Sequence, residues 1–106
     1  MISEERAEKA IHYLADTDEK AAFAKVEAER LEDEIKATKA AILLRVEGSV
    51  AVREALAETH ENTVAARKEY YAQLLVHEKY YNRSKIEERI TDLWRTVASN
   101  RRHGSV

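Results

Sequence analysis

The histidines and carboxylates are the side chains of this sequence with the most chemical potential. His60 and His77 each precede a glutamate, as in the zinc-binding pattern H-E-x-x-H, but Val64 and Tyr81 occupy the positions where that pattern requires a second histidine. The Glu-x-x-His spacing of di-iron bundles does not occur either. We therefore expect no metal site. His77 falls on an apolar helix stripe and should pack between helices, whereas His12 and His60 should be solvated.

The carboxylates are distributed like a solvated helix surface rather than a catalytic site. Residues 27–34 hold a dense acidic run, but a general acid–base pair needs two carboxylates in a shared pocket, which a helical rod does not offer. The acids of residues 16–19 lack the glycine and the ligand spacing of a calcium loop. The chain has no cysteine, which excludes thiolate nucleophiles and thiolate metal sites. We expect no catalytic residue, no cofactor and no enzymatic activity.

Charge is divided unevenly along the chain. Residues 1–63 hold 9 Lys and Arg against 15 Asp and Glu, net −6, whereas residues 64–106 hold 9 against 5, net +4. The basic part also holds five of the seven aromatic residues, including the single tryptophan. Arginines interleaved with aromatics suit sequence-tolerant binding of single-stranded nucleic acid, through phosphate neutralisation and base stacking. The cluster comprises Arg83, Lys85, Arg89, Arg95, Arg101 and Arg102 with Tyr80, Tyr81 and Trp94.

The same pattern has a structural reading. In this interpretation the aromatic residues, which recur at helical spacing, are core residues. The oppositely charged halves of the chain then neutralise each other within a hairpin or across a dimer. The sequence leaves both readings open.

Composition predicts that long helices position these residues. The chain has 106 residues, two glycines and no proline, which excludes turn-rich sheet folds, and it is rich in alanine, glutamate, lysine, arginine and leucine. Its length allows one domain. We expect helices at 3–15, 17–46, 50–82 and 85–100, a turn at 47–49 and a frayed tail at 101–106.

Local signals set these bounds. Ser3 is a predicted N-cap, and Gly48 with Ser49 predicts a helix end followed by a new cap. Two further capping-box patterns, Asp16 with Glu19 and Ser84 with Glu87, predict restarts inside the long helical stretches. The second restart coincides with a change of phase, because the stripe through residues 52–81 does not continue into Ile86, Ile90, Leu93 and Val97.

The predicted architecture is all-α: a long antiparallel, coiled-coil-like helical hairpin with a kinked N-terminal arm and a short C-terminal helix. Each rod has one apolar stripe and one neighbour, so we expect a homo-oligomer, a dimer or larger, to cover the remaining apolar surface. The acidic N-terminus and the absence of a long apolar run predict no signal peptide and no membrane segment, hence a cytoplasmic protein.

The C-terminal residues 90–104, ITDLWRTVASNRRHG, resemble the ending of a group of small all-helical proteins of tailed bacteriophages and prophages. These proteins carry a Trp-Arg pair in their last helix and close with Ala-x-Asn-Arg-Arg and a glycine. The turn at 47–53, EGSVAVR, is also similar to theirs. The family is often encoded beside recombination or replication genes. The resemblance points to Trp94, Arg95, Asn100, Arg101 and Arg102 as contact positions.

The leading functional hypothesis is a non-enzymatic phage accessory protein that contacts single-stranded DNA, or a phage or host DNA-handling protein, through its basic C-terminal segment. The alternatives are an adaptor or inhibitor of a host protein and a virion assembly or structural factor. The sequence leaves open the partner, the oligomer number and whether the hairpin closes within one chain or is swapped between chains.

Overall fold

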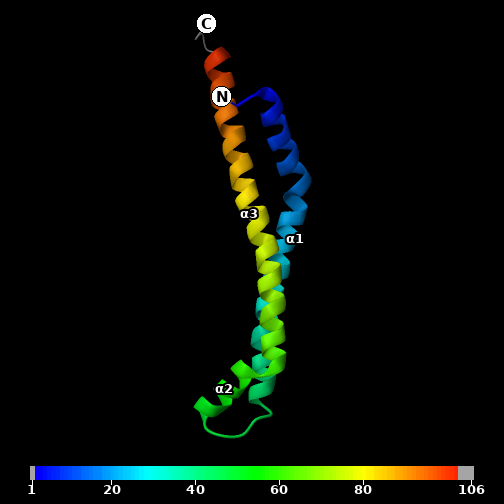
Figure 1. The fold of residues 1–106 in the computed structure, drawn as a ribbon, viewed down its shortest axis with the longest axis vertical. Coiled ribbons are helices and arrows are strands. Elements are labelled where there is room, and N and C mark those ends of the chain that lie inside the picture. The colour runs from blue at the N-terminus through cyan, green and yellow to red at the C-terminus, as the bar shows by residue number, and fades with distance from the viewer. Residues whose placement is uncertain (1, 103–106) are drawn as a thin grey trace. The chain divides into compact units, whose positions relative to one another are not determined.

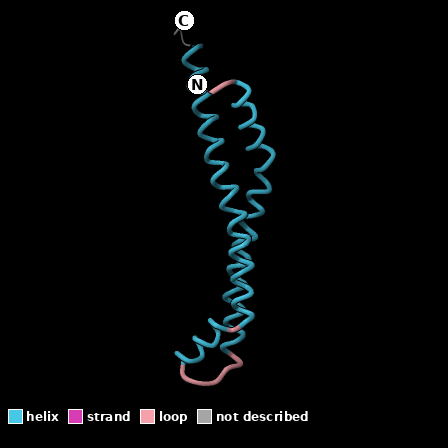
Figure 2. Tube along the Cα trace, in the orientation of Figure 1, coloured by secondary structure: helices cyan, strands magenta, loops and turns pink. Residues whose placement is uncertain are grey.

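The computed structural model describes residues 2–102, which form three α-helices and no strand (Figure 1). Helix α1 spans Glu4–Leu43, α2 spans Val50–Thr59 and α3 spans Glu61–Arg102. Figure 2 shows the loop that separates α1 from α2 and the short break between α2 and α3. The all-α prediction is confirmed. None of the helices in residues 2–102 is long and apolar enough to cross a membrane.

The chain forms two compact units. A terminal unit consists of Met1–Ala22 and Glu78–Val106, and a central unit consists of Phe23–His77. In the terminal unit the start of α1 pairs with the end of α3, because Arg6 contacts Glu87 and Tyr13 contacts Arg83. The residue numbers of these partners decrease along α3 as they increase along α1, so the two segments run antiparallel.

Both long helices bury residues at heptad spacing, the repeat of a coiled-coil seam. On α1 the protected positions are small or aliphatic at almost every turn. They are Ala7, Ala10, Leu14, Thr17, Ala21, Ala24, Ala28, Leu31, Ile35, Thr38 and Ile42. On α3 the corresponding positions are far more polar. They are Thr63, Ala66, Tyr70, Gln73, His77, Tyr80, Ser84, Glu87, Thr91, Trp94 and Ala98. His77 is half-buried on this seam, as expected.

The predicted restart in the N-terminal arm is wrong, because α1 is one helix through residues 16–19. Asp16 and Glu19 are exposed, and the seam position is Thr17, whose hydroxyl donates to the Tyr13 carbonyl at 2.6 Å. Internal bonding of this kind lets threonine stay inside a helix. The predicted helices 3–15 and 17–46 are therefore a single helix, which ends at Leu43.

The predicted restart at residues 82–85 is also wrong, because α3 continues to Arg102. The apparent change of phase arose from treating Ile86 and Leu93 as core residues, yet they are 55% and 52% exposed. Glu87 and Thr91 are buried in their place, so the seam keeps its phase with polar residues. Arg101 and Arg102 are helical rather than frayed, and residues 103–106 of the predicted tail lie outside the described part of the chain.

The turn after α1 is close to its prediction, although the loop covers 44–49 rather than 47–49. Gly48 has a φ of +127°, a region that side-chain-bearing residues avoid. The Ser49 hydroxyl accepts from the Val52 amide, which confirms this N-cap. Arg53 of α2 donates to the Leu43 carbonyl at 2.8 Å and so satisfies a backbone group at the end of α1.

The helix predicted over 50–82 is interrupted at His60, between α2 and α3. His60 has an extended ψ of 140°, and its Nδ1 accepts from the Asn62 amide at 3.0 Å. It is therefore the N-cap of α3 and half-buried, not the solvated side chain that we expected. Arg67 supports the break by donating to the Glu58 carbonyl at 3.1 Å.

Candidate functional site

A buried carboxylate fixes the pairing of α1 and α3 in the terminal unit. The Glu87 side chain is 1% exposed and accepts both Nη1 and Nη2 of Arg6, at 2.8 and 2.7 Å. Arg83, one turn earlier on α3, donates its Nε to Glu87 at 2.7 Å. Thr91, one turn later, donates its hydroxyl to the Glu87 carbonyl at 2.9 Å. Two guanidinium groups thus compensate one buried charge, as burial of a charge requires.

These contacts have electrostatic consequences. The hydrogen bond from Arg6 is the main reason why the pKa of Glu87 lies below its usual value, with Arg83 acting in the same direction and burial opposing both. The Arg83 guanidinium also lies over the Tyr13 ring, 5.0 Å from its centroid. Arg83, a predicted nucleic-acid contact, therefore has a structural role in the hairpin.

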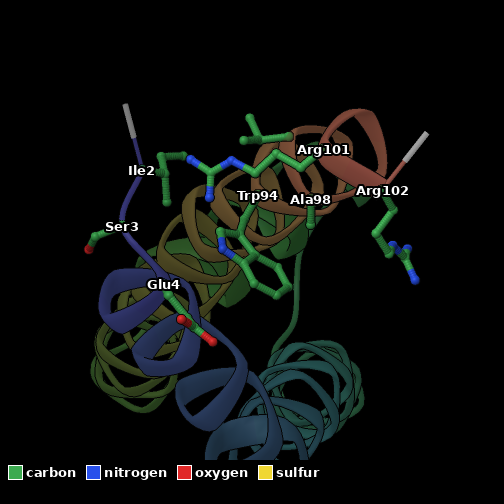
Figure 3. A pocket seen from close by; sticks show the side chains of 8 residues that line it. Ile2, Ser3, Glu4, Trp94, Ala98, Arg101 and Arg102 are labelled. Carbon is green, nitrogen blue, oxygen red and sulfur yellow. The ribbon is translucent and has the colours of Figure 1, made fainter. Parts of the chain in front are cut away.

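Beyond this ion pair, residues from the start of the chain and from the end of α3 line an open pocket of about 520 Å³, here called the terminal cavity. Figure 3 shows side chains from the start of the chain facing side chains from the end of α3. The lining residues are Ile2, Ser3, Glu4, Trp94, Val97, Ala98, Arg101 and Arg102. Three of them, Trp94, Arg101 and Arg102, are predicted contact residues, and the structure brings them together around one space.

The fold explains why these side chains meet. Trp94 occupies the seam position one heptad after Glu87, so the register set by Arg6 and Glu87 aims its indole at the beginning of α1. The Ser3 hydroxyl accepts the Arg6 amide at 3.1 Å, and this N-cap fixes where α1 begins. Helix α3 extends eight residues past Trp94, which carries Arg101 and Arg102 to the cavity.

The walls of the terminal cavity differ in chemistry. In Figure 3 the Arg101 guanidinium lies beside Ile2, Arg102 extends to the other side of the indole, and the Glu4 carboxylate lies on the α1 side. The two arginines offer only hydrogen-bond donors, whereas the ionised Glu4 offers only acceptors. The indole supplies an apolar π-face between them. Such a site suits a flat ligand that carries both an anionic group and a donor edge.

Both charged walls also suit the helix ends on which they lie. Glu4 and Glu5 occupy the first turn of α1, and Arg101 and Arg102 occupy the last turn of α3. Each placement is favoured by the helix dipole. Helix stability alone therefore explains why Glu4, Arg101 and Arg102 occupy these positions. It does not explain the terminal cavity next to Trp94.

The remaining predicted contact residues lie on the surface of α3, outside the terminal cavity. Lys85 lies over the Tyr81 ring, 4.6 Å from its centroid, and Tyr81 raises the pKa of this lysine through a hydrogen bond. Arg95 approaches exposed Asp92 at 3.9 Å, a contact worth little in water. Arg89 and Asn100 are exposed. Whether these four residues contact a ligand stays a prediction.

Sequence reasoning missed Ile2, Ser3 and Glu4 as site residues. Nothing in their local pattern points to binding, since Ser3 and Glu4 read as an ordinary helix start. The available signal was topological, because an antiparallel hairpin places the first residues of one helix beside the last residues of the other. No cluster of three or more potential metal ligands occurs in residues 2–102.

Comparison of the chain with protein-family models, with curated proteins and with solved structures found no match.

Proposed function

We propose that this chain is a non-enzymatic binding protein that holds single-stranded nucleic acid on the basic end of α3. The observation that carries the proposal is the terminal cavity, where Trp94 lies between Arg101 and Arg102. Aromatic stacking combined with phosphate neutralisation is the usual basis of sequence-tolerant single-strand binding. The predicted phage origin, and with it a place beside recombination or replication proteins in a host cytoplasm, is part of this proposal.

The charges of the surrounding surface support the proposal. Residues 79–102 contain seven Lys and Arg against three Asp and Glu, net +4. All seven basic residues are exposed, whereas one of the three acids, Glu87, is buried and paired with arginines. Arg83 pairs with Glu87, so the other six basic residues face only Glu88 and Asp92, and this surface keeps a net charge of +4. The 17 residue steps from Lys85 to Arg102 extend about 26 Å along the helix, enough to follow several phosphates.

The test is a titration with an oligothymidylate of about 15 nucleotides at about 50 and 200 mM salt. Trp94 emission reports on the site because it is the single tryptophan, and the anisotropy of a labelled strand gives the affinity independently. We expect quenching and a bound fraction that falls sharply at the higher salt. A variant with Arg95, Arg101 and Arg102 replaced by alanine should reduce the slope of log K against log salt by about 2.

The matched control replaces three exposed lysines of α1, Lys20, Lys25 and Lys36, with alanine. It removes the same charge from the acidic part of the chain and should leave the salt slope of binding unchanged within about 0.5. If neither Trp94 emission nor strand anisotropy shows binding at the lower salt, the proposal is overturned. A protein partner, as in the adaptor, inhibitor or virion alternatives, would then be sought.

We also propose that the protein self-associates through apolar side chains that its own hairpin leaves exposed. Two of them, Ile86 and Leu93, lie seven residues apart on one side of α3. Sedimentation equilibrium over a hundredfold range of concentration tests this. A mass that rises from one chain to two or more supports the proposal, and a constant monomer mass overturns it.

A further inference from the structure

We propose that the terminal cavity takes one unpaired nucleobase and that Glu4 selects its identity, favouring guanine and disfavouring thymine. This inference rests on the proposed function and adds base selectivity to it. It starts from the size of the site. A volume of about 520 Å³ lies in the range of small-molecule pockets, roughly 300–1,000 Å³. The cavity is thus suited to a single nucleotide unit of a strand rather than to a stretch of backbone.

Trp94 defines how a base lies in the cavity. It is the single aromatic residue among the lining residues, and the indole forms the apolar surface between the two charged walls. A base stacked on this ring has its edges directed toward the walls. Loss of one such stack lowers affinity by roughly 5- to 150-fold.

The charged walls orient the nucleotide. Arg101 and Arg102 donate to phosphate oxygens, so the sugar–phosphate side of the unit faces the end of α3. The opposite edge of the base then faces the beginning of α1, where Glu4 lies. Within residues 2–102 the Glu4 carboxylate makes no side-chain hydrogen bond and no ion pair, so it is available to a ligand. A phosphate is excluded from this wall by its like charge.

Carboxylate chemistry then discriminates among bases. Guanine presents two adjacent donors on its Watson–Crick edge, the ring N1–H and the exocyclic amine, and both can bond one carboxylate. Cytosine and adenine present one amine donor beside a ring acceptor. Thymine and uracil present one N–H flanked by two carbonyl oxygens, which a carboxylate repels. A bidentate contact to a base typically discriminates by roughly 5- to 150-fold.

The experiment compares an oligothymidylate of about 15 nucleotides with the same strand carrying one central guanine, at about 50 mM salt. Labelled-strand anisotropy gives the affinity, and Trp94 emission reports occupancy of the terminal cavity. We expect the guanine strand to bind about tenfold more tightly and to quench the tryptophan more strongly. A strand with a central cytosine should have intermediate affinity.

Glu4→Gln is the decisive variant, and Glu5→Gln is its matched control. The amide of Glu4→Gln can donate to a thymine carbonyl, so the preference for guanine should shrink to less than about twofold. Glu5 is exposed, pairs with Lys9 at 3.6 Å and does not line the cavity. Its substitution removes the same charge from the same helix turn and should preserve the tenfold preference. Neither position is buried, so both variants keep the fold.

The outcomes separate the two proposals. Salt-dependent binding with equal affinity for the guanine and thymine strands overturns the selection by Glu4 and leaves single-strand binding intact. A preference that persists in Glu4→Gln also overturns it. Absence of binding to every strand overturns both proposals. Trp94→Phe, read by anisotropy, should weaken the guanine strand severalfold, and an unchanged affinity would place the base elsewhere.

Discussion

Replacing Glu87 by glutamine should destabilise the terminal unit, because a buried carboxylate is its principal polar contact between helices. The substitution keeps the side-chain size but removes the charge that accepts three arginine hydrogen bonds. An amide oxygen in the Oε1 position can still accept from Arg6 Nη2 and Arg83 Nε, but the NH₂ group then faces the donor Arg6 Nη1 and is left buried without an acceptor.

The size of the effect follows from the exposure of the partners. Hydrogen bonds to charged groups contribute about 1.5–3 kcal/mol each, and breaking a fully buried ion pair costs about 3–5 kcal/mol. Here the Arg6 and Arg83 side chains are 37% and 56% exposed. Water can therefore hydrogen-bond any guanidinium N–H that loses the carboxylate, which lowers the cost. We expect a loss of about 2 kcal/mol, which for a chain of this size lowers the melting temperature by roughly 8 °C.

Urea unfolding followed by far-ultraviolet circular dichroism measures the total loss, and amide hydrogen exchange locates it. Exchange should accelerate at residues 7–14 of α1 and remain unchanged at residues 28–35, which belong to the central unit. Glu88→Gln is the control, because Glu88 is the exposed neighbour on the same helix. If Glu87→Gln costs no more than Glu88→Gln, or less than about 0.5 kcal/mol, the contact does not hold the unit together.

Acid provides a second measurement of the same contact. The pKa of Glu87 lies below the ordinary carboxyl value of 4.5, chiefly because Arg6 donates to it. As the pH falls below that ordinary value, the unfolded chain takes up the proton first, so the stability contributed by Glu87 is lost as the pH passes its folded-state pKa. The difference between the wild type and Glu87→Gln should therefore be complete at neutral pH and shrink below pH 4.5. Glu27, whose pKa is lowered by Arg30, is common to both proteins and cancels.

Three further substitutions test local features of the central unit by thermal or urea unfolding. Gly48→Ala should cost about 1–2 kcal/mol, since φ is +127° and the new Cβ would lie 3.1 Å from Val52; no loss would contradict the strained turn. His60→Ala should cost about 1 kcal/mol by removing the cap on the Asn62 amide, whereas His60→Asn should retain most of the stability; equal losses would contradict the capping role. Thr63→Val should raise stability by about 1 kcal/mol, because the buried Thr63 hydroxyl has no partner in the described structure; a decrease would indicate that it is bonded.

The sequence predicts the helical class and two of the helix starts well, because these depend on local chemistry. Ser3 and Ser49 both cap helices as expected, and the absence of proline leaves nothing to break the long helices. The break at His60 was missed because histidine is an uncommon N-cap residue. Its Nδ1 can accept the Asn62 amide only because the backbone at His60 is extended, which the sequence does not reveal.

The two false restarts share one physical cause. A capping-box pattern is a local preference of about 1 kcal/mol, and continuing the helix along a partner outweighs it. At the second site the glutamate of the pattern, Glu87, bonds Arg6 on the other long helix. That contact joins residues 81 positions apart, so no local reading reveals it.

The residues of the candidate site also fall into those that local sequence predicted and those that only the fold revealed. Trp94, Arg101 and Arg102 were identified from their types and spacing, and these three lie together because α3 is continuous past residue 94. Glu4, to which we assign the proposed base selection, became a candidate only when the hairpin register was known. The pairing of Arg83 with Glu87 and Tyr13 is likewise a feature that residue type did not reveal; its side chain is still 56% exposed, and a nucleic-acid contact by Arg83 stays a prediction.

The distribution of polar and apolar residues on α3 links the stability of the hairpin to its proposed binding role. Burying Glu87 and Thr91 while exposing Ile86 and Leu93 gives up hydrophobic stabilisation, at about 25 cal/mol per Å² of apolar surface left in water. The buried contact favours the present register, because a shift by one turn would take Arg6 away from the buried Glu87 carboxylate. The register places Trp94 opposite Glu4. A more apolar seam would be more stable and would allow sliding, which would close or misalign the terminal cavity. The proposed site, which is assembled from both ends of the chain, therefore depends on the register that the polar seam favours.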